Sequence, residues 1–596
     1  MTSINTGELK FKYFHYLKCT FFSVYRCTIN EENTRERIQE TARRFRKAIS
    51  AEIKGKLICI KVDSCSKGVR KFFAINLQFI DKKRIQLRVL AVREMLVSET
   101  GHNLRLVIED VLWEYSIPVE CIYTLTSDNG GNMICAAQLL GQSQDEVAAE
   151  LYFPPDNTDT LDCGCVLGSG DFKVKSVRCA ADTLQLAVDG GRKDIPATEI
   201  IIEKIRELAK SLRTPNGWKQ LTNNGLTIPC LDVSTRWHTI HDMLQSVRNL
   251  REFLEEKYVG NACELLTNEE WDELHSVLAS LGPAKIATKR LQEEQLLLGD
   301  FLAVWMNCKD ALKKTGTPLA NAIVRRMDEQ AKGTTYKRGP NKGEELRSSL
   351  LESPIFLAAI CMDPRYFNYL DETQVATAKT HLVKLWSRME AIKKRQENLK
   401  EDEHHQTAES MDGAASEEND GNSSSDDEFT KFLKKKDEKR TQDVSLKSEI
   451  VKILDSYYAE TKRLSRKADV LEYWWDQRKI SPELYELSCV ALAVPATQVS
   501  VERLFSSLRF ILNPLRQNLQ STFVEDMLVI RNNTIFMSKT HESTSKKPRK
   551  HSSASNSSNT VSLEQQNSSS ISLNSVSTSS NVTPTSPTNF DFEDIL

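Results

Sequence analysis

Residues 56–92 read KLICIKVDSCSKGVRKFFAINLQFIDKKRIQLRVLAV, and this stretch decides the fold. It contains three segments rich in β-branched and aromatic residues, and short polar connections separate them. A period of two in such segments is typical of β-strands, and short polar links between strands are typical of hairpins. The stretch therefore predicts a three-stranded antiparallel meander.

A helix and a fourth strand are expected after the meander. Apolar residues at helical spacing predict a helix from about Ser98 to Tyr115. After Pro118 the segment VECIYTLTSD predicts a fourth strand, and a Gly-Gly turn then opens a helix at Asn132. This order of elements predicts an α/β fold that begins as a ribonuclease-H-like mixed sheet.

Two aspartates lie at the ends of predicted strands. Asp63 follows the apolar residues of the first strand, and Asp128 closes the fourth strand. Because these strands lie side by side in such a sheet, the two carboxylates can approach each other, and they repel unless cations lie between them. An ordinary Asp-Asn-Gly-Gly turn is the simpler interpretation of Asp128 alone. The preceding strand and Asp63 together favour a functional site.

The segment Ser481–Asn533 carries a third acid within a run of apolar residues at helical spacing. This acid is Glu502, and Arg503 follows it directly. A carboxylate among packed apolar residues is costly unless it is paired or holds a metal. Glu502 is therefore either part of a surface turn with Arg503 or a functional carboxylate.

Motifs in this segment resemble the C-terminal dimerisation region of hAT-superfamily DNA transposases, and further matches run through most of residues 33–533. The family places a Pro and then Ser-x-Glu-Arg-x-Phe-Ser before an Arg-x-x-Leu and an Asn. The residues that match in order are Pro495, Ser500, Glu502, Arg503, Phe505, Ser506, Arg516, Leu519 and Asn532. The turn motif of the family is matched by Ser127, Asp128, Gly130, Asn132 and Met133.

The resemblance implies a catalytic DDE triad of Asp63, Asp128 and Glu502. In such a triad the three carboxylates hold two Mg²⁺ (or Mn²⁺) ions. One metal activates water or a DNA 3′-hydroxyl for attack, and the other stabilises the leaving oxygen. The implied reaction is DNA strand cleavage and transfer.

One motif departs from the family. The segment VRCAADTLQLAV resembles a Cys-x-x-His motif that lies near the active site, and Cys179 fits it, but Asp182 stands where the His is expected. An imidazole donates a hydrogen bond or proton near neutral pH, whereas an aspartate accepts and adds a charge. Asp182 is either a further carboxylate near the metals or a sign that catalysis has decayed, and we favour the second.

Helical patterns from Ala197 to about Trp386 predict a large all-helical insertion domain in the sheet. Within it, Arg236 and Trp237 open an amphipathic helix. Most tryptophans are core residues, and this is the simpler interpretation of Trp237. The resemblance instead implies that this Arg-Trp pair binds DNA, with the indole stacked on an extruded base.

Composition divides the chain further. Residues 401–430 contain 11 acids and no Lys or Arg, so they cannot bury enough apolar surface to order themselves. The predicted domains are a helical segment without an intact zinc finger (1–54), the first part of the core (55–195), the helical insertion (196–395), a disordered linker, acidic and then basic (396–444), the end of the core with the hAT dimerisation region (445–537), and a disordered Ser/Thr/Asn-rich tail (538–596).

The sequence does not predict a zinc site. Relatives often begin with a zinc finger of the BED type, but here His15 precedes both Cys19 and Cys27, and no spaced His pair follows them. No run approaches the roughly 18 apolar residues of a membrane span, so we expect no membrane partner. The 80 basic residues nearly balance the 82 acidic ones, so any DNA-binding surface has to be local.

The predicted function is that of a hAT transposase-like protein that binds DNA and forms a homodimer or higher homo-oligomer. A basic cluster, KKPRK at residues 546–550, is compatible with import into the nucleus. Two alternatives stay open, namely a domesticated, non-catalytic nuclear protein that binds DNA or other proteins, and a helical scaffold that keeps only the dimerisation surface.

Overall fold

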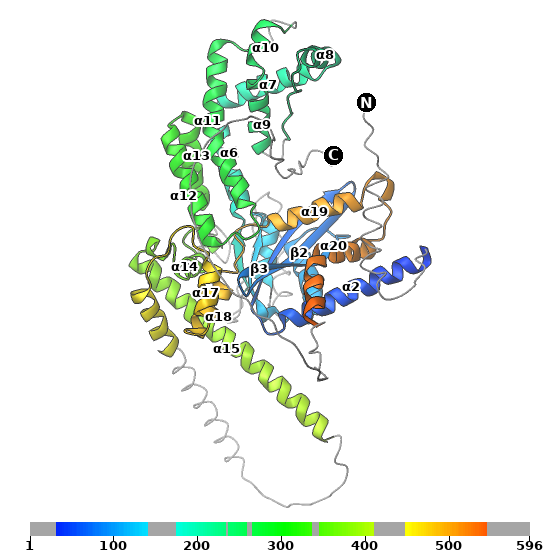
Figure 1. Cartoon of the computed structure of the whole chain (residues 1–596), viewed down its shortest axis with the longest axis vertical. Helices are drawn as coiled ribbons and strands as arrows, with labels where there is room; N and C mark the ends of the chain where they lie inside the picture. Colours follow the sequence, from blue (N-terminus) through cyan, green and yellow to red (C-terminus); the bar gives the residue numbers. More distant parts are fainter. Residues whose placement is uncertain are drawn as a thin grey trace, which may run out of the picture. The chain divides into compact units, whose positions relative to one another are not determined.

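The computed structural model describes residues 31–140, 174–233, 237–258, 265–335, 345–409 and 448–544. Its central feature is a five-stranded sheet of order β3-β2-β1-β4-β5, which Figure 1 shows with helices beside it. The strands are β1 (Ile58–Lys67), β2 (Arg70–Asp81), β3 (Arg84–Glu94), β4 (Ile122–Ser127) and β5 (Lys175–Arg178).

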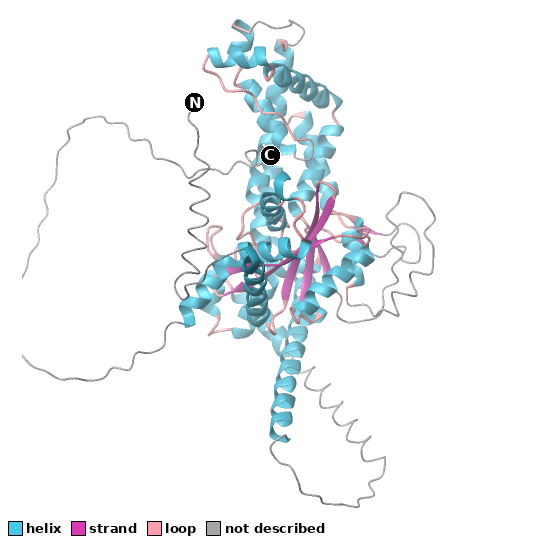
Figure 2. Cartoon of the chain, turned by 90° about the vertical axis from the view of Figure 1, so that its right-hand side faces the viewer, coloured by secondary structure: helices cyan, strands magenta, loops and turns pink. Residues whose placement is uncertain are grey.

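The sheet is mixed, and its antiparallel part confirms the predicted meander. Strand β2 pairs antiparallel with both β1 and β3. Gly68 turns the chain between β1 and β2 at a φ of 61°, a left-handed conformation that glycine adopts without strain. Strands β4 and β5 add on in parallel at the other side of β1, and the strands stand out in magenta in Figure 2.

The fifth strand is missing from the prediction. Strand β5 has only four residues, KSVR, and three of them are polar. Such a segment lacks the apolar alternation that predicts a strand, and its pairing with β4 decides its conformation.

Three helices cover the first part of the sheet. They are α2 (Glu31–Ile53), α3 (Gly101–Glu114) and α4 (Gly131–Leu139). The helix predicted near Asn132 begins one residue earlier, and a 3₁₀ turn (Val119–Cys121) replaces the start of the predicted fourth strand. Tyr115 ends α3 and ties it to the sheet, because its hydroxyl donates to the Leu90 carbonyl at 2.7 Å.

A long helical insertion follows β5, as predicted. Several of its helices start with Pro, a residue whose fixed φ suits the first helical position. The helices are α6 (Ala180–Lys193), α7 (Pro196–Leu212), α8 (Pro215–Asn223), α9 (Trp237–Arg248), α10 (Arg251–Glu256), α11 (Asn268–Leu291), α12 (Leu298–Thr315), α13 (Pro318–Ala331), α14 (Pro354–Cys361) and α15 (Glu372–Glu409).

Three features after α13 differ from the sequence prediction. A two-stranded hairpin of β6 (Thr334–Thr335) and β7 (Glu345–Arg347) interrupts the helices. Helix α15 continues through residues 396–409, which composition assigned to the linker. The start of the tail is also helical, because α20 reaches Thr544.

The C-terminal part returns to the sheet. Residues 448–460 are helical, and α17 (Val470–Gln477), α18 (Pro482–Ala491), α19 (Val499–Ile511) and α20 (Ser521–Thr544) follow. The apolar faces of α19 and α20 pack on β2 and β3 in one buried cluster, and Figure 1 shows α19 beside the strands. The cluster contains Phe72, Ala74, Val89, Val92, Val501, Leu504, Phe505, Leu508, Ile511, Leu512, Val524 and Leu528.

This packing accounts for the helical periodicity of residues 481–533. Leu504 and Leu508 are at most 1% exposed, because the sheet of the same chain covers them. A self-association surface on this region therefore has to use residues outside that apolar stripe. Among the described helices, none is both long and apolar enough to span a membrane.

Candidate active site

Strand register places the two aspartates at the same level of the sheet. The parallel pairing of β1 with β4 ends at Lys61 and Thr126. Asp63 lies two residues after Lys61, and Asp128 lies two residues after Thr126. The sequence predicted that the first strand ends at Asp63. In the structure β1 continues to Lys67 and pairs with β2 over this length. Asp63 therefore lies where β1 has lost its parallel neighbour, which leaves room for a side chain.

The Asp128 side chain is fixed by the turn that follows β4. Its Oδ1 accepts a hydrogen bond from the Gly130 amide at 3.0 Å. A side chain at residue 130 would bring its Cβ to 2.9 Å from that same oxygen, so a larger residue there would displace the Asp128 carboxylate. The turn chemistry and the functional interpretation of Asp128 are thus compatible.

Glu502 lies in the first turn of α19, the helix that packs on β1 and β2. Val501 and Leu504 on either side of it are buried, whereas Glu502 itself is exposed. Its neighbour Arg503 pairs with Glu294 at 3.0 Å, so the two adjacent residues do not form the surface turn weighed from sequence.

The segment before α19 holds this helix against the sheet edge. Residues 491–499 are all buried. The Pro495 carbonyl accepts from the Thr126 hydroxyl at 3.1 Å, and the Ala496 carbonyl accepts from the Ala180 amide at 2.9 Å. On the other side, the Thr497 hydroxyl donates to the Leu291 carbonyl at 3.3 Å. The segment thus contacts β4, α6 and α11, three elements distant in sequence.

Asp182 joins the acids from the first turn of α6, and Cys179 caps this helix. Burial raises the pKa of Asp182, and a side-chain hydrogen bond with Cys179 opposes that effect. The other carboxylate oxygen, Oδ2, is buried and has no hydrogen-bond partner among the described residues. Burial also raises the pKa of the Cys179 thiol, which keeps that thiol neutral.

Three other acids act on the pKa of Asp63, and the four together are called the acidic cluster below. The pKa of Asp63 rises to about 8, chiefly because the carboxyl is buried. The charges of Asp128, Glu502 and Asp182 raise it further. A like charge nearby disfavours the charged form of a carboxyl group, and burial adds to this effect. The structure therefore places Asp63, Asp128, Asp182 and Glu502 near one another, while their roles in metal binding and catalysis stay predictions.

The cluster suits a divalent cation in its donor chemistry. Carboxylate oxygens are the preferred ligands of Mg²⁺, and a cation would compensate the repulsion that acts on Asp63 and the unpartnered Oδ2 of Asp182. Within the described part of the chain, however, no three His, Cys, Asp or Glu side chains are arranged to hold one metal ion. The acids thus form an electrostatic cluster and not a closed metal cage.

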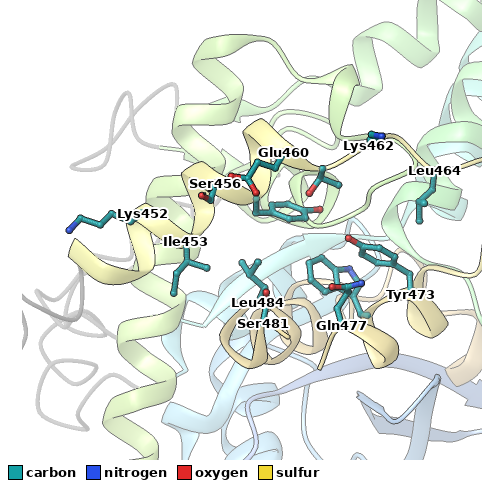
Figure 3. Close-up of a pocket in the computed structure, with 13 residues that line it drawn as sticks. Lys452, Ile453, Ser456, Glu460, Lys462, Leu464, Tyr473, Gln477, Ser481 and Leu484 are labelled. Carbon is teal, nitrogen blue, oxygen red and sulfur yellow. Dashed lines mark hydrogen bonds between the residues drawn. The ribbon is translucent and has the colours of Figure 1, made fainter. Parts of the chain in front are cut away.

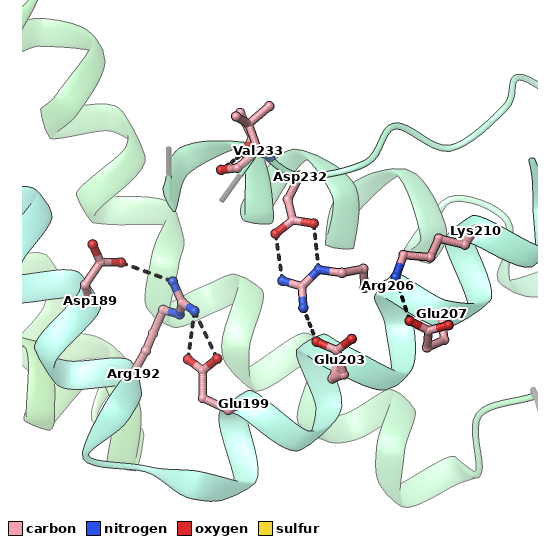
Figure 4. Close-up of polar contacts among 10 residues, drawn as sticks. Asp189, Arg192, Glu199, Glu203, Arg206, Glu207, Lys210, Asp232 and Val233 are labelled. Atoms are coloured by element: carbon pink, nitrogen blue, oxygen red, sulfur yellow. Dashed lines mark hydrogen bonds and ion pairs between the residues drawn. The ribbon is translucent and has the colours of Figure 1, made fainter. Parts of the chain in front are cut away.

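The predicted DNA-binding pair is described only in part. Arg236 lies outside the described residues, while Trp237 begins α9 and is 3% exposed in the helical core. Its packing is that of a core residue, and stacking on a base stays a prediction. Ion pairs hold the preceding segment to α7, since Arg206 donates to both oxygens of Asp232 at 2.8 and 2.7 Å (Figure 4).

The segment MDPRY (residues 362–366) has a structural role that the sequence alone did not indicate. The carboxylate of Asp363 is fully buried and accepts from the Arg365 guanidinium at 3.0 and 2.8 Å. The same guanidinium reaches Asp300 at 2.7 Å. A side chain at Gly299 would collide with Asp363, so glycine is required there. Only the tertiary structure brings Asp300 to this pair.

A cavity lies apart from the acids. It has a volume of about 660 Å³ among residues 452–484, and Figure 3 shows Lys452, Lys462 and Tyr473 around it. None of its lining residues belongs to the acidic cluster. The cavity therefore takes no part in the site described above.

Two regions of the chain match models of known protein families. Residues 453–534 match the hAT family C-terminal dimerisation region. The resemblance to hAT-superfamily transposases is thereby confirmed. Residues 177–280 match the ZBED1 RNase-like helical domain, which includes most of α6 to α11. The hAT dimerisation region contains Glu502 and the buried segment before α19, and it supports homo-oligomerisation.

Two curated relatives match longer stretches of the chain. The chain is 23% identical over 361 residues to zinc finger BED domain-containing protein 4 of Homo sapiens, covering 59% of this chain and 28% of the relative. It is 24% identical over 340 residues to tpeD of Talaromyces stipitatus, whose name proposes a role as transcriptional regulator, covering 51% of this chain and 38% of the relative. The chain thus spans well under half the length of each.

Proposed function

We propose that this protein is a self-associating, DNA-binding protein of hAT transposase type whose acidic cluster positions a divalent cation against a DNA phosphate. The observation that carries the proposal is the strand register that brings Asp63 and Asp128 to one level of the sheet, together with Glu502 on the helix that packs on β1. These acids come from β1, the end of β4 and α19, which are far apart in sequence. Carboxylates grouped in this way are typical of two-metal phosphoryl-transfer sites.

The fold supports the same proposal. The strand order 3-2-1-4-5, with the first three strands antiparallel and the last two parallel, is what a ribonuclease-H-like core would require. Asp63, Asp128 and Glu502 would hold Mg²⁺ or Mn²⁺. When bound, the cation would supply a nucleophilic oxygen at neutral pH and stabilise the leaving oxygen. The chain itself contributes the carboxylates and the helix that carries Glu502 to the sheet.

A second candidate is a domesticated protein that binds DNA without cutting it. Asp182 favours this candidate, because it stands at the family's His position and adds a negative charge where a proton donor is expected. The basic cluster at 546–550 suits a nuclear protein under either candidate.

A nicking assay separates the candidates. Purified full-length protein is incubated with Mg²⁺ or Mn²⁺ and a labelled DNA hairpin, with Asp128→Asn as the matched inactive control. Metal-dependent nicking by the wild type alone supports the cutting function. Binding of the DNA by a dimer without nicking supports the second candidate. A folded protein that binds no DNA over a range of salt concentrations contradicts both.

A further inference from the structure

Two arginines reach the turn that follows Asp128 and contact the same residue. Arg178 ends β5 opposite Ser127 of β4, and its Nε donates to Oδ1 of Asn129 at 2.9 Å. Arg347 comes from β7 of the helical insertion, and its Nη2 donates to the carbonyl of Asn129 at 3.0 Å. Asn129 follows Asp128, so both guanidinium groups reach the turn that carries a predicted catalytic acid.

Neither arginine has a counter-charge among the described residues. Neither forms an ion pair within the described chain, and both donate hydrogen bonds to neutral groups. Arg178 is 6% exposed. Burial, and next the positive charge of Arg347, lower the pKa of Arg178 to about 10. A buried guanidinium without a counter-charge is costly, and the structure carries this cost at the turn that follows Asp128.

Arg347 keeps an unused donor in this place. Its Nε is buried and has no hydrogen-bond partner among the described residues. Buried polar groups are nearly always hydrogen-bonded, and an exception calls for an explanation such as an absent ion. Guanidinium groups bind phosphate with short, charge-assisted hydrogen bonds, often two at a time.

We infer that Arg178 and Arg347 form an anion site that binds a phosphate of the DNA backbone beside the acidic cluster. This inference rests on the proposed function, because it names the group that the acids would face. Arg347 belongs to the insertion and Arg178 to the sheet, so a bound phosphate also links the two parts. Arg178 holds the insertion independently, since its Nη1 donates to the carbonyls of Gln330 and Lys332 at 2.8 and 3.3 Å.

The test uses inorganic phosphate first, because this probe does not require any DNA binding. Thermal unfolding of the full chain is measured in phosphate and in chloride at equal ionic strength. We expect phosphate to raise the unfolding temperature of the wild type and of Arg325→Gln, a control at an exposed arginine of α13. Arg347→Gln loses this stabilisation, while Arg347→Lys keeps part of it because it keeps the charge.

DNA binding is then measured for the same four proteins over a series of salt concentrations. Arg347→Gln is expected to weaken binding about tenfold and to lower the slope of log K against log salt by roughly 0.9, the value for one phosphate contact. Equal phosphate stabilisation of the wild type and Arg347→Gln overturns the anion site. If phosphate discriminates between them but the wild type binds no DNA, the anion site stands and the proposed function fails.

Discussion

Two acids in this protein, Asp363 and Asp63, differ in their charged partners. Asp363 lies deep in the helical part, and Arg365 neutralises it through two side-chain hydrogen bonds. Asp63 lies in the sheet, and the charged neighbours that act on its pKa are three further acids. A buried carboxylate keeps its desolvation cost low only while its cation is present, whereas carboxylates that repel one another weaken the fold. The difference distinguishes an acid retained for structure from acids retained for a ligand.

The largest effect is expected from a substitution that removes the cationic partner of Asp363. Arg365→Met leaves Asp363 fully buried without its cation, and we expect the free energy of unfolding to fall by about 3–5 kcal/mol. Urea unfolding at neutral pH measures this loss. A decrease below about 1 kcal/mol would mean that the Asp363 pair contributes no more than a surface ion pair.

Removing a charge from the acidic cluster should instead raise the free energy of unfolding. The pKa of Asp63 is about 8 in the folded chain against an ordinary 3.8, so the folded state binds a proton that the unfolded state releases. The stability from Asp63 is therefore fully present below pH 4 and is lost as the pH rises through 8. Asp63→Asn does not titrate, and we expect it to be more stable than wild type at pH 8 by at least about 1.4 kcal/mol.

The measurement is urea unfolding of both proteins at pH 5 and pH 8. Asp81→Asn, at the far end of β2, serves as control and should follow the wild-type profile. A parallel pH profile for Asp63→Asn and wild type would show that Asp63 does not lie among repelling charges.

A cation should reverse the repulsion in the acidic cluster. Mg²⁺ at ten times its dissociation constant is expected to stabilise the wild type by about 1.4 kcal/mol. Asp63→Asn and Asp128→Asn should lose most of this gain, since each removes one charged ligand. Arg365→Met should keep it, because Asp363 lies apart from the cluster. The same Mg²⁺ stabilisation in all four proteins would place the cation elsewhere.

The smallest effect is expected at an exposed ion pair. Lys379 of α15 pairs with Asp455, whose side chain is 57% exposed. Asp455→Asn should lower the free energy of unfolding by less than about 1 kcal/mol, because water screens the pair. The comparison with Arg365→Met in the same unfolding assay then measures how strongly burial changes the value of one ion pair.

Sequence reasoning predicted much of the fold where local pattern decides it. The meander, α3, α4 and the C-terminal helices follow from periodicity and turn residues. It did not predict β5 or the β6–β7 hairpin, because short polar segments become strands only through pairing. It also chose Asp63, Asp128, Asp182 and Glu502, which the structure brings into one cluster.

The sequence by itself determined which residues carry charge and which segments are apolar, and these properties predict elements and candidate acids. The tertiary structure alone decided the neighbours of each acid. It buried the apolar stripe of α19 on the sheet and directed Arg503 toward Glu294. It also gave Asp363 a cation, left Asp63 among acids, and brought Arg347 to Asn129. Burial and electrostatic coupling depend on contacts between segments hundreds of residues apart, which no local pattern specifies.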